Sequence, residues 1–235
     1  GAADDSPKMN GIPERLEQVR ARIRAAAAAC GRAPDTIALL AVSKTKPAGD
    51  VRRAFVAGQR AFGENYLQDA MGKILALDDL PIEWHFIGRV QGNKTADIAR
   101  HFAWVHGLDR LSHAERLSRH RAPGQPDLQV CIQVNLSGEA SKGGVQPDEV
   151  AALARQVADL PRLRLRGLMT MPDPDSDACA QRSVFAGLRR LLERLQADGL
   201  AVDTLSMGMS GDMEAAIAEG ATIVRIGTDI FGARQ

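Results

Sequence analysis

The stretch TIALLAVSK, from Thr36 to Lys44, is a nearly continuous apolar run that ends in a lysine. Runs of this kind are typical of strands that are buried on both faces of a parallel sheet. Before it, apolar residues at helical spacing predict a helix over residues 12–29. After it, Pro47 ends the strand, and an amphipathic segment over 50–58 predicts a second helix. The main fold therefore begins with a strand and a helix, and one additional helix precedes them.

The same alternation continues along the chain. Further strands are predicted over residues 61–64, 83–87, 104–108, 128–135, 163–171, 204–209 and 222–226, and further helices over 66–76, 94–101, 112–120, 147–160, 176–198 and 211–218. Eight strands alternating with helices predict the α/β class and a single (β/α)8 TIM barrel with an extra N-terminal helix. An open doubly wound sheet is the alternative, but no Gly-x-Gly-x-x-Gly turn follows the first strand. We expect residues 1–9 to be disordered and residues 10–235 to form one barrel domain.

Composition excludes several classes of function. The net charge of +1 over 235 residues argues against nucleic-acid and membrane-surface partners. The densest basic cluster, Arg162, Arg164 and Arg166, alternates with leucines, which favours a strand edge or a turn over a nucleic-acid site. Three cysteines without a C-x-x-C pair argue against disulfides and structural zinc and fit a reducing compartment. With no signal peptide, no membrane-length apolar run and no large apolar stripe, we expect a cytoplasmic monomer.

Lys44 is the strongest candidate for chemistry because it comes at the end of a buried strand. In barrels of parallel strands, functional residues lie at the C-terminal ends of the strands. Partial burial there would disfavour the ammonium form of a lysine and favour a free amine, which can attack a carbonyl and form an imine. A solvated lysine at a strand exit is the simpler alternative. Lys46, two residues further on, is a second candidate that spacing alone does not separate from Lys44.

Two turns near the C-terminus predict an anion-binding site. Ser210-Gly211 precedes a predicted helix, and Gly227-Thr228 follows the last strand, so backbone N–H groups of both turns can meet a phosphate. Barrels often bind phosphate after strands seven and eight. An ordinary helix cap and an ordinary turn glycine are the alternatives. Arg225 lies on the same strand face as Gly227, where a phosphate, a pyridine nitrogen or a neighbouring carboxylate could meet its charge.

Several motifs in order resemble the pyridoxal phosphate homeostasis protein family, which is related to the barrel domain of alanine racemase. They are LLAVSKTKP (39–47), FGENY (62–66), WHFIG (84–88), RLRGLMTM (164–171), LSMGMS (205–210) and RIGTDIFGAR (225–234). The resemblance implies that Lys44, rather than Lys46, carries pyridoxal 5′-phosphate (PLP) as a Schiff base. It further implies that the cofactor is bound by Asn65, His85, Met209, Ser210, Arg225, Gly227 and Thr228, with Ser210, Gly227 and Thr228 on the phosphate and Arg225 at the pyridine nitrogen.

The resemblance also implies a carrier or buffer of PLP in intracellular homeostasis, with little or no turnover. An arginine beside the pyridine nitrogen would discourage its protonation and weaken the electron sink. Alanine racemase takes a second base from the tyrosine of a C-terminal β-domain, whereas this sequence ends at Gln235, just past the last predicted strand, and its one tyrosine is Tyr66. The expected partners are PLP and, beyond it, PLP-dependent client enzymes or amino acids. An amino-acid racemase using Lys46 or His85 as the second base, and a barrel enzyme that forms a Schiff base between Lys44 and a sugar phosphate, remain as alternatives.

Overall fold

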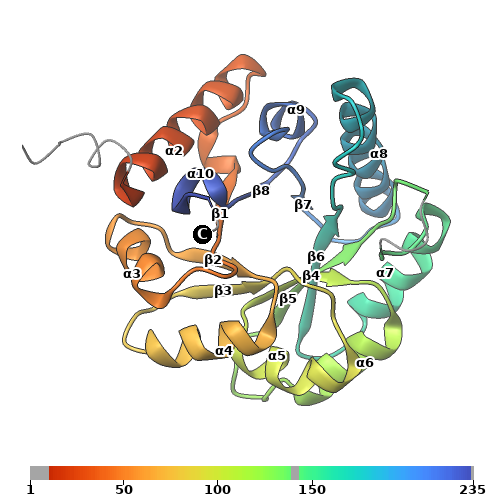
Figure 1. Cartoon of the computed structure of the whole chain (residues 1–235). Helices are drawn as coiled ribbons and strands as arrows, with labels where there is room; N and C mark the ends of the chain where they lie inside the picture. The colour runs from red at the N-terminus through yellow and green to blue at the C-terminus, as the bar shows by residue number, and fades with distance from the viewer. Residues whose placement is uncertain (1–10, 139–142, 234–235) are drawn as a thin grey trace, which may run out of the picture.

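The computed structural model describes residues 11–138 and 143–233, which form a closed barrel of eight parallel strands, each hydrogen-bonded to the next (Figure 1). The barrel closes because β1 pairs with β8, with Ala38 opposite Ile223 and Leu40 opposite Arg225. This closure confirms the predicted TIM barrel and excludes the open sheet. The predicted disorder of residues 1–9 lies outside the described residues. The strands are β1 (Ala38–Val42), β2 (Ala61–Glu64), β3 (Glu83–Phe86), β4 (Trp104–Leu108), β5 (Leu128–Gln133), β6 (Leu163–Met169), β7 (Thr204–Ser206) and β8 (Ile223–Ile226).

Helices surround the barrel on its outside (Figure 1). The N-terminal helix α2 (Ile12–Ala29) buries one face against α3, α9 and α10. Because α10 is only four residues long, α2 covers the part of the wall between α3 and α9 that a full helix after β8 would cover. The other helices are α3 (Ala48–Val56), α4 (Leu67–Ala76), α5 (Thr95–His101), α6 (Leu111–His120), α7 (Val150–Ala158), α8 (Ala178–Ala197), α9 (Met213–Ala218) and α10 (Thr228–Phe231).

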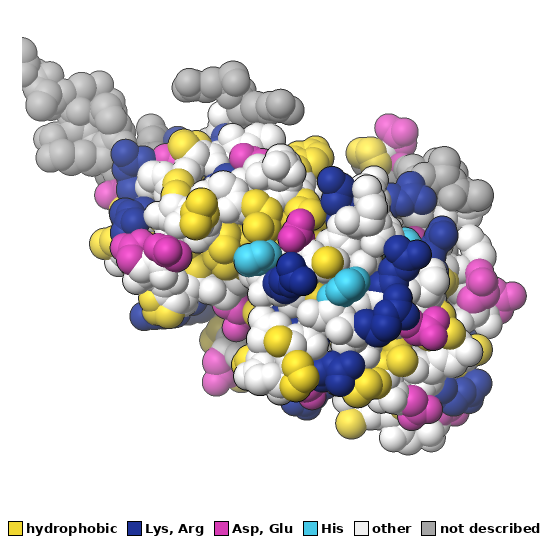
Figure 2. Space-filling model, turned by 90° about the horizontal axis from the view of Figure 1, so that it is seen from below, with side chains coloured by type: hydrophobic (Ala, Val, Ile, Leu, Met, Phe, Trp, Pro, Cys, Tyr) yellow, Lys and Arg dark blue, Asp and Glu magenta, His cyan; other side chains and the backbone are white. Residues whose placement is uncertain are grey.

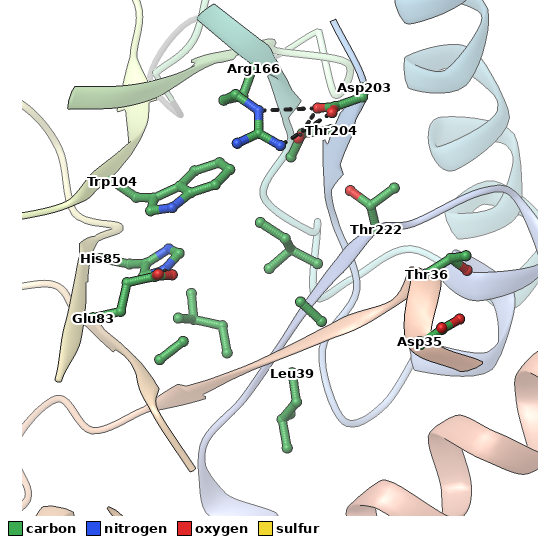
Figure 3. A pocket seen from close by; sticks show the side chains of 14 residues that line it. Asp35, Thr36, Leu39, Glu83, His85, Trp104, Arg166, Asp203, Thr204 and Thr222 are labelled. Carbon is green, nitrogen blue, oxygen red and sulfur yellow. Dashed lines mark hydrogen bonds and ion pairs between the residues drawn. The ribbon is translucent and has the colours of Figure 1, made fainter. Parts of the chain in front are cut away.

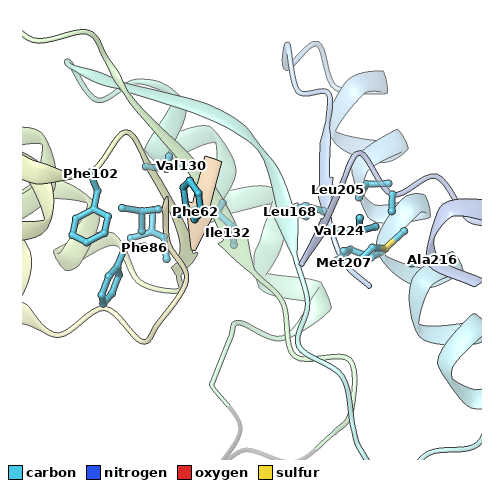
Figure 4. Close-up of a cluster of buried hydrophobic side chains, with 14 of the residues drawn as sticks. Phe62, Phe86, Phe102, Val130, Ile132, Leu168, Leu205, Met207, Ala216 and Val224 are labelled. Atoms are coloured by element: carbon cyan, nitrogen blue, oxygen red, sulfur yellow. The ribbon is translucent and has the colours of Figure 1, made fainter. Parts of the chain in front are cut away.

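The apolar core lies mainly between the strands and the helices. Outward-facing side chains such as Phe62 and Phe86 are buried there, and the rings of Phe86 and Phe102 meet edge to face at 5.3 Å (Figure 4). Alternate residues of each strand point into the barrel instead. This inner face carries a small apolar cluster and a set of buried polar side chains, including Arg225. The polar interior therefore lies directly beneath the C-terminal mouth.

The structure corrects some predicted boundaries at that mouth. The seventh strand ends at Ser206 instead of residue 209, because Gly208 adopts a φ of 103° and turns the chain. The following helix begins at Met213, since the Asp212 side chain accepts a hydrogen bond from the Met209 N–H at 2.6 Å and closes a turn first. The helix α10 was not predicted, because a single turn is too short for an apolar period.

Basic and acidic side chains are mixed on the surface. On the face shown in Figure 2, lysines and arginines occur in separate groups with acidic and histidine side chains among them. Two arginines of the basic cluster are engaged in the structure: Arg166 pairs with Asp203 at 3.2 Å, and Arg162 donates to the Ser118 carbonyl at 2.9 Å. Among the helices of residues 11–138 and 143–233, none combines the length and the hydropathy needed to span a bilayer.

Candidate functional site

A cavity of about 370 Å³ opens at the C-terminal ends of the strands. Its size is within the range of small-molecule sites. The cavity brings together most of the predicted site residues from four parts of the chain; those that line it are Lys44, Asn65, Met209, Ser210, Arg225, Gly227 and Thr228. The predicted turn residue Gly211 lines it as well, whereas sequence reasoning missed several other lining residues, among them Val42, Ile87, Met171 and Gly232. Most of these are apolar or glycine, so they carry no chemical signal of their own.

Lys44 and Lys46 differ in what they contact. The Lys46 Nζ donates to the Gly232 carbonyl at 3.0 Å, which ties it to the C-terminal segment. Lys44 has no hydrogen-bond or ion-pair partner in the described part of the chain, and its side chain is exposed at the cavity. The expected partial burial of Lys44 is therefore not found, because β1 ends two residues earlier, at Val42, and Lys44 lies in the turn beyond it. Of the two amines, the one on Lys44 is available to a ligand.

A buried ion pair supports the turn that carries Lys44. The Lys73 Nζ, on α4, donates to the Ser43 carbonyl at 2.6 Å and lies 3.0 Å from the carboxylate of Glu64, which also accepts from the Ser43 hydroxyl. Burial raises the pKa of Glu64, and the Lys73 charge opposes that shift. Beside them, the backbone N–H of Thr45 donates to Asp69 at 3.2 Å, although Thr45 has a positive φ of 64°. These contacts fix the backbone on both sides of Lys44.

The two predicted anion-binding turns face the cavity together. In the first, Asp212 closes the loop, and the N–H groups of Ser210 and Gly211 donate to no acceptor within the residues described. In the second, Gly227 approaches β1 so closely that a Cβ there would lie 3.2 Å from the Val42 carbonyl oxygen. Glycine is the residue that accommodates this approach. Backbone donors without partners, beside a lysine, make this end of the cavity attractive to an anion.

Arg225 forms the floor of the cavity from β8. The residue is 3% exposed, and its guanidinium donates to the Ser206 hydroxyl at 2.8 Å and to the Thr170 carbonyl at 2.9 Å. Burial lowers its pKa to about 10, and the charge of Asp212 opposes the shift, so the group is cationic at neutral pH. The predicted alternative of a salt bridge is not found, since no carboxylate in the described residues lies within ion-pair distance of Arg225.

Asn65 presents an unsatisfied polar group in the wall of the cavity. Its Oδ1 is buried and has no hydrogen-bond partner among the described residues. Buried polar atoms in folded proteins are nearly always paired, so such an orphan indicates a missing ligand or water. Around the rim, Tyr66, Met171 and Met209 are exposed large side chains that also line the cavity. They offer apolar surface to a bound ring.

The structure does not bring His85 to this cavity. His85 and Ile87, two residues apart, share the inward face of this segment, and only Ile87, just after β3, lines the C-terminal cavity. The His85 ring lies deeper in the barrel, where it lines a second cavity at the N-terminal ends of the strands. The expectation that His85 contacts the cofactor is therefore corrected: one strand repeat, roughly 6.6 Å, separates it from the mouth.

The closed barrel, the lysine after its first strand and the paired turns after its last two strands define an alanine racemase-like barrel. The family profile described as "Alanine racemase, N-terminal domain" matches residues 15–235. The chain belongs to the pyridoxal phosphate homeostasis protein family, as its motifs predicted. It is 60% identical over 227 residues to the pyridoxal phosphate homeostasis protein of Pseudomonas aeruginosa, covering 97% of both chains.

Two further relatives agree with this assignment. The pyridoxal phosphate homeostasis protein of Escherichia coli K12 is 52% identical over 230 residues, which cover 97% of this chain and 98% of the relative. Among solved structures, PipY of Synechococcus elongatus with PLP bound superimposes with a TM-score of 0.84 at 38% identity, over 94% of this chain and all of PipY. The relatives match along almost their whole length, so the barrel described here corresponds to nearly all of each.

Proposed function

We propose that this protein binds PLP in the C-terminal cavity and acts in intracellular PLP homeostasis as a carrier or buffer of the cofactor. The observation that carries the proposal is the arrangement in one cavity of the Lys44 amine, two turns and a buried guanidinium on Arg225, with the amine and the turn N–H groups unpaired among the described residues. The names of the relatives and the PLP-bound PipY structure support the same ligand.

The residues fit the cofactor group by group. Ser210, Gly211, Gly227 and Thr228 would hold the phosphate, because their turns offer donors at one end of the cavity. Arg225 would face the pyridine nitrogen, and Lys44 would hold the aldehyde carbon. The orphaned amide of Asn65 would gain a hydrogen-bond partner from the ligand. When bound, PLP supplies an aldehyde that an amine can attack and a ring that withdraws electrons.

The residues around Arg225 favour binding over turnover. A guanidinium has only donors, so Arg225 would leave the pyridine nitrogen unprotonated and the ring a weak electron sink. Tyr66 is 55% exposed at the rim, and Lys46 is tied to the Gly232 carbonyl, so neither is held ready as a second base. We therefore expect little or no racemase activity. Solvent deuterium entering the α-position of an amino acid in the presence of the protein would contradict this expectation.

The decisive experiment is an absorbance titration of the protein with PLP, followed by borohydride reduction and peptide mapping. We expect a reducible chromophore and a pyridoxyl group on Lys44. Lys46→Ala is the matched control, since it removes an amine two residues away, and it should leave the adduct on Lys44. A chromophore of unchanged stoichiometry in Lys44→Ala would contradict the assignment. If the wild-type protein binds no PLP but forms an adduct with a sugar phosphate, the result would favour a barrel enzyme that forms a Schiff base between Lys44 and a sugar phosphate.

Location and assembly complete the proposal. Three free cysteines, one of them buried, fit a cytoplasmic protein. We further propose that the protein is a monomer whose partners beyond PLP are PLP-dependent enzymes or amino acids, and that it binds neither nucleic acid nor membranes. Size-exclusion chromatography with light scattering, with and without PLP, tests whether the protein is a monomer.

A further inference from the structure

A row of hydrogen-bonded polar side chains runs through the interior of the barrel from one mouth to the other. It starts at Glu83 and ends at Arg225. The Glu83 carboxylate lies 2.7 Å from His85 Nε2, His85 Nδ1 lies 2.8 Å from His106 Nε2, and His106 Nδ1 lies 2.8 Å from the Ser206 hydroxyl. That hydroxyl in turn lies 2.8 Å from Arg225 Nη1. Each member contacts the next, so the row is continuous.

The two ends of the row lie in different environments. His85, His106, Ser206 and Arg225 are at most 3% exposed. The Glu83 side chain is 51% exposed, and it lines a cavity of about 290 Å³ built from the first residues of the strands (Figure 3). The Trp104 ring stacks on His85 with centroids 5.2 Å apart, which restricts the plane of the imidazole. The row therefore links the N-terminal mouth of the barrel, where Glu83 is exposed, to the floor of the cofactor cavity.

Hydrogen-bonding capacity assigns a direction to the row. The Glu83 carboxylate, whose pKa is lowered chiefly by its hydrogen bond to His85, can only accept, so His85 donates to it from Nε2 and, as a neutral ring, accepts at Nδ1. His106 then donates from Nε2 to His85 Nδ1 and accepts at Nδ1 from the Ser206 hydroxyl, whose oxygen accepts from Arg225. Burial lowers the pKa of both histidines, which favours the neutral rings that this pattern requires. Each imidazole nitrogen and the Ser206 hydroxyl hydrogen then has one partner in the row.

We propose that Glu83, His85, His106 and Ser206 are positioning residues that orient the Arg225 guanidinium in the cofactor cavity, and that Glu83 anchors them from the opposite mouth of the barrel. Among the residues that the structure describes, the only other oxygen acceptor of Arg225 is the Thr170 carbonyl, which accepts from Nη2, so loss of the row leaves Nη1 without its partner. The inference rests on the proposed function, in which Arg225 faces the pyridine nitrogen. It assigns a role to His85 that does not require contact with the ligand.

The first test is nitrogen NMR of the full-length chain, labelled in histidine and arginine, before and after addition of PLP. In both states we expect His85 and His106 to be neutral with the hydrogen on Nε2, and we expect resolved Nη signals from a restrained Arg225. Arg225→Lys assigns these arginine signals. A hydrogen on Nδ1 of His106, or a freely rotating Arg225 guanidinium, would overturn the proposal.

The second test compares variants at the N-terminal mouth. Glu83→Ala should mix the tautomers of both histidines, alter the Arg225 signals, shift the absorbance maximum of bound PLP and weaken PLP binding about three- to tenfold. Glu83→Gln retains an acceptor and should restore most of these properties. Asp35→Ala is the matched control, because Asp35 is an exposed carboxylate that lines the same cavity without contacting His85.

The outcomes separate this inference from the proposed function. Equal PLP affinity in Glu83→Ala and Asp35→Ala, with unchanged Arg225 signals, would refute the positioning role. If the wild-type protein binds no PLP while Glu83→Ala still alters the signals of His106 and Arg225, the proposed function fails and the positioning role of the row is supported.

Discussion

The guanidinium of Arg22 donates a hydrogen bond to the carbonyl oxygen of Ser210 at 3.0 Å. Arg22 lies on α2, outside the barrel, and Ser210 lies in the first of the two anion-binding turns. The same guanidinium pairs with Glu214 at 2.9 Å and with Asp229 at 3.1 Å. Glu214 follows the first turn and Asp229 follows the second. The N-terminal helix thus connects the two turns that would hold the phosphate.

We expect Arg22→Ala to weaken PLP binding about two- to fivefold, because partly exposed ion pairs contribute up to about 1 kcal/mol each and the turns would lose their common partner. Fluorescence or absorbance titration measures the dissociation constant. Arg24→Ala is the control, since Arg24 pairs with Glu17 on the same helix and touches neither turn. Equal affinities of the two variants would argue against a bracing role for Arg22.

Removal of Lys73 should destabilise the fold beneath Lys44. Lys73→Met leaves the buried Glu64 carboxylate without its cation, and breaking a buried pair in this way costs about 3–5 kcal/mol. Urea denaturation at pH 7 measures the change in the free energy of unfolding. The double variant Glu64→Gln/Lys73→Met removes the uncompensated charge as well, so it should recover part of the loss. A loss in the single variant below about 1 kcal/mol would show that the pair contributes little.

The same pair predicts how stability depends on pH. Burial raises the pKa of Glu64 in the folded state, so between the ordinary glutamate pKa and the raised value the folded protein binds more protons than the unfolded chain. The contribution of Glu64 to stability therefore falls as the pH rises through this window. In Lys73→Met the fall should be steeper, because the charge that opposes the shift is gone. Glu64→Gln/Lys73→Met has no carboxylate at position 64, so its free energy of unfolding should lack this pH-dependent fall in denaturation curves recorded between pH 5 and 8.

Gly88 lies against the backbone of Asn65, and we expect Gly88→Ala to affect both the fold and the site. A Cβ at this position would overlap the Asn65 carbonyl oxygen, so the backbone of one segment must move. Overpacking of this kind costs about 1–3 kcal/mol, and displacement of Asn65 should also weaken PLP binding. Gly72→Ala, in α4 with open space around it, is the control and should raise stability by about 0.5–1 kcal/mol. Thermal unfolding and PLP titration of both variants give the comparison.

The three cysteines should differ in reactivity. Cys131 is buried in β5, and burial raises the pKa of its thiol to about 12, whereas Cys30 and Cys179 are exposed. The thiolate is the reactive form, so a thiol reagent at pH 8 should label two cysteines rapidly and the third only after unfolding. Cys131→Ala should leave the number of rapidly labelled cysteines unchanged. Rapid labelling of three cysteines in the native protein would show that β5 opens readily.

Much of the fold followed from local patterns because each strand is buried and each is followed by a turn. The strands β2 and β4 and the helix α2 begin and end at the predicted residues. Boundaries differed where a single side chain or a positive φ ends an element, as at Gly208 and Asp212. The polar row through the barrel was not predicted, since Glu83, His85, His106 and Ser206 come from three separate strands. The order of pairing around the barrel brings them together.

The amino-acid sequence alone determined the barrel class, the family, and the positions of Lys44 and of the two turns along the chain. These could be predicted because strand periodicity and motif spacing depend only on the order of the residues. Tertiary structure decided which of those residues meet. Within the described residues, it left Lys44 unpaired and tied Lys46 to a carbonyl, and it placed His85 deeper in the barrel than the C-terminal mouth. The physical reason is that these outcomes depend on distances between segments that are far apart in the sequence, and closure of the barrel sets those distances.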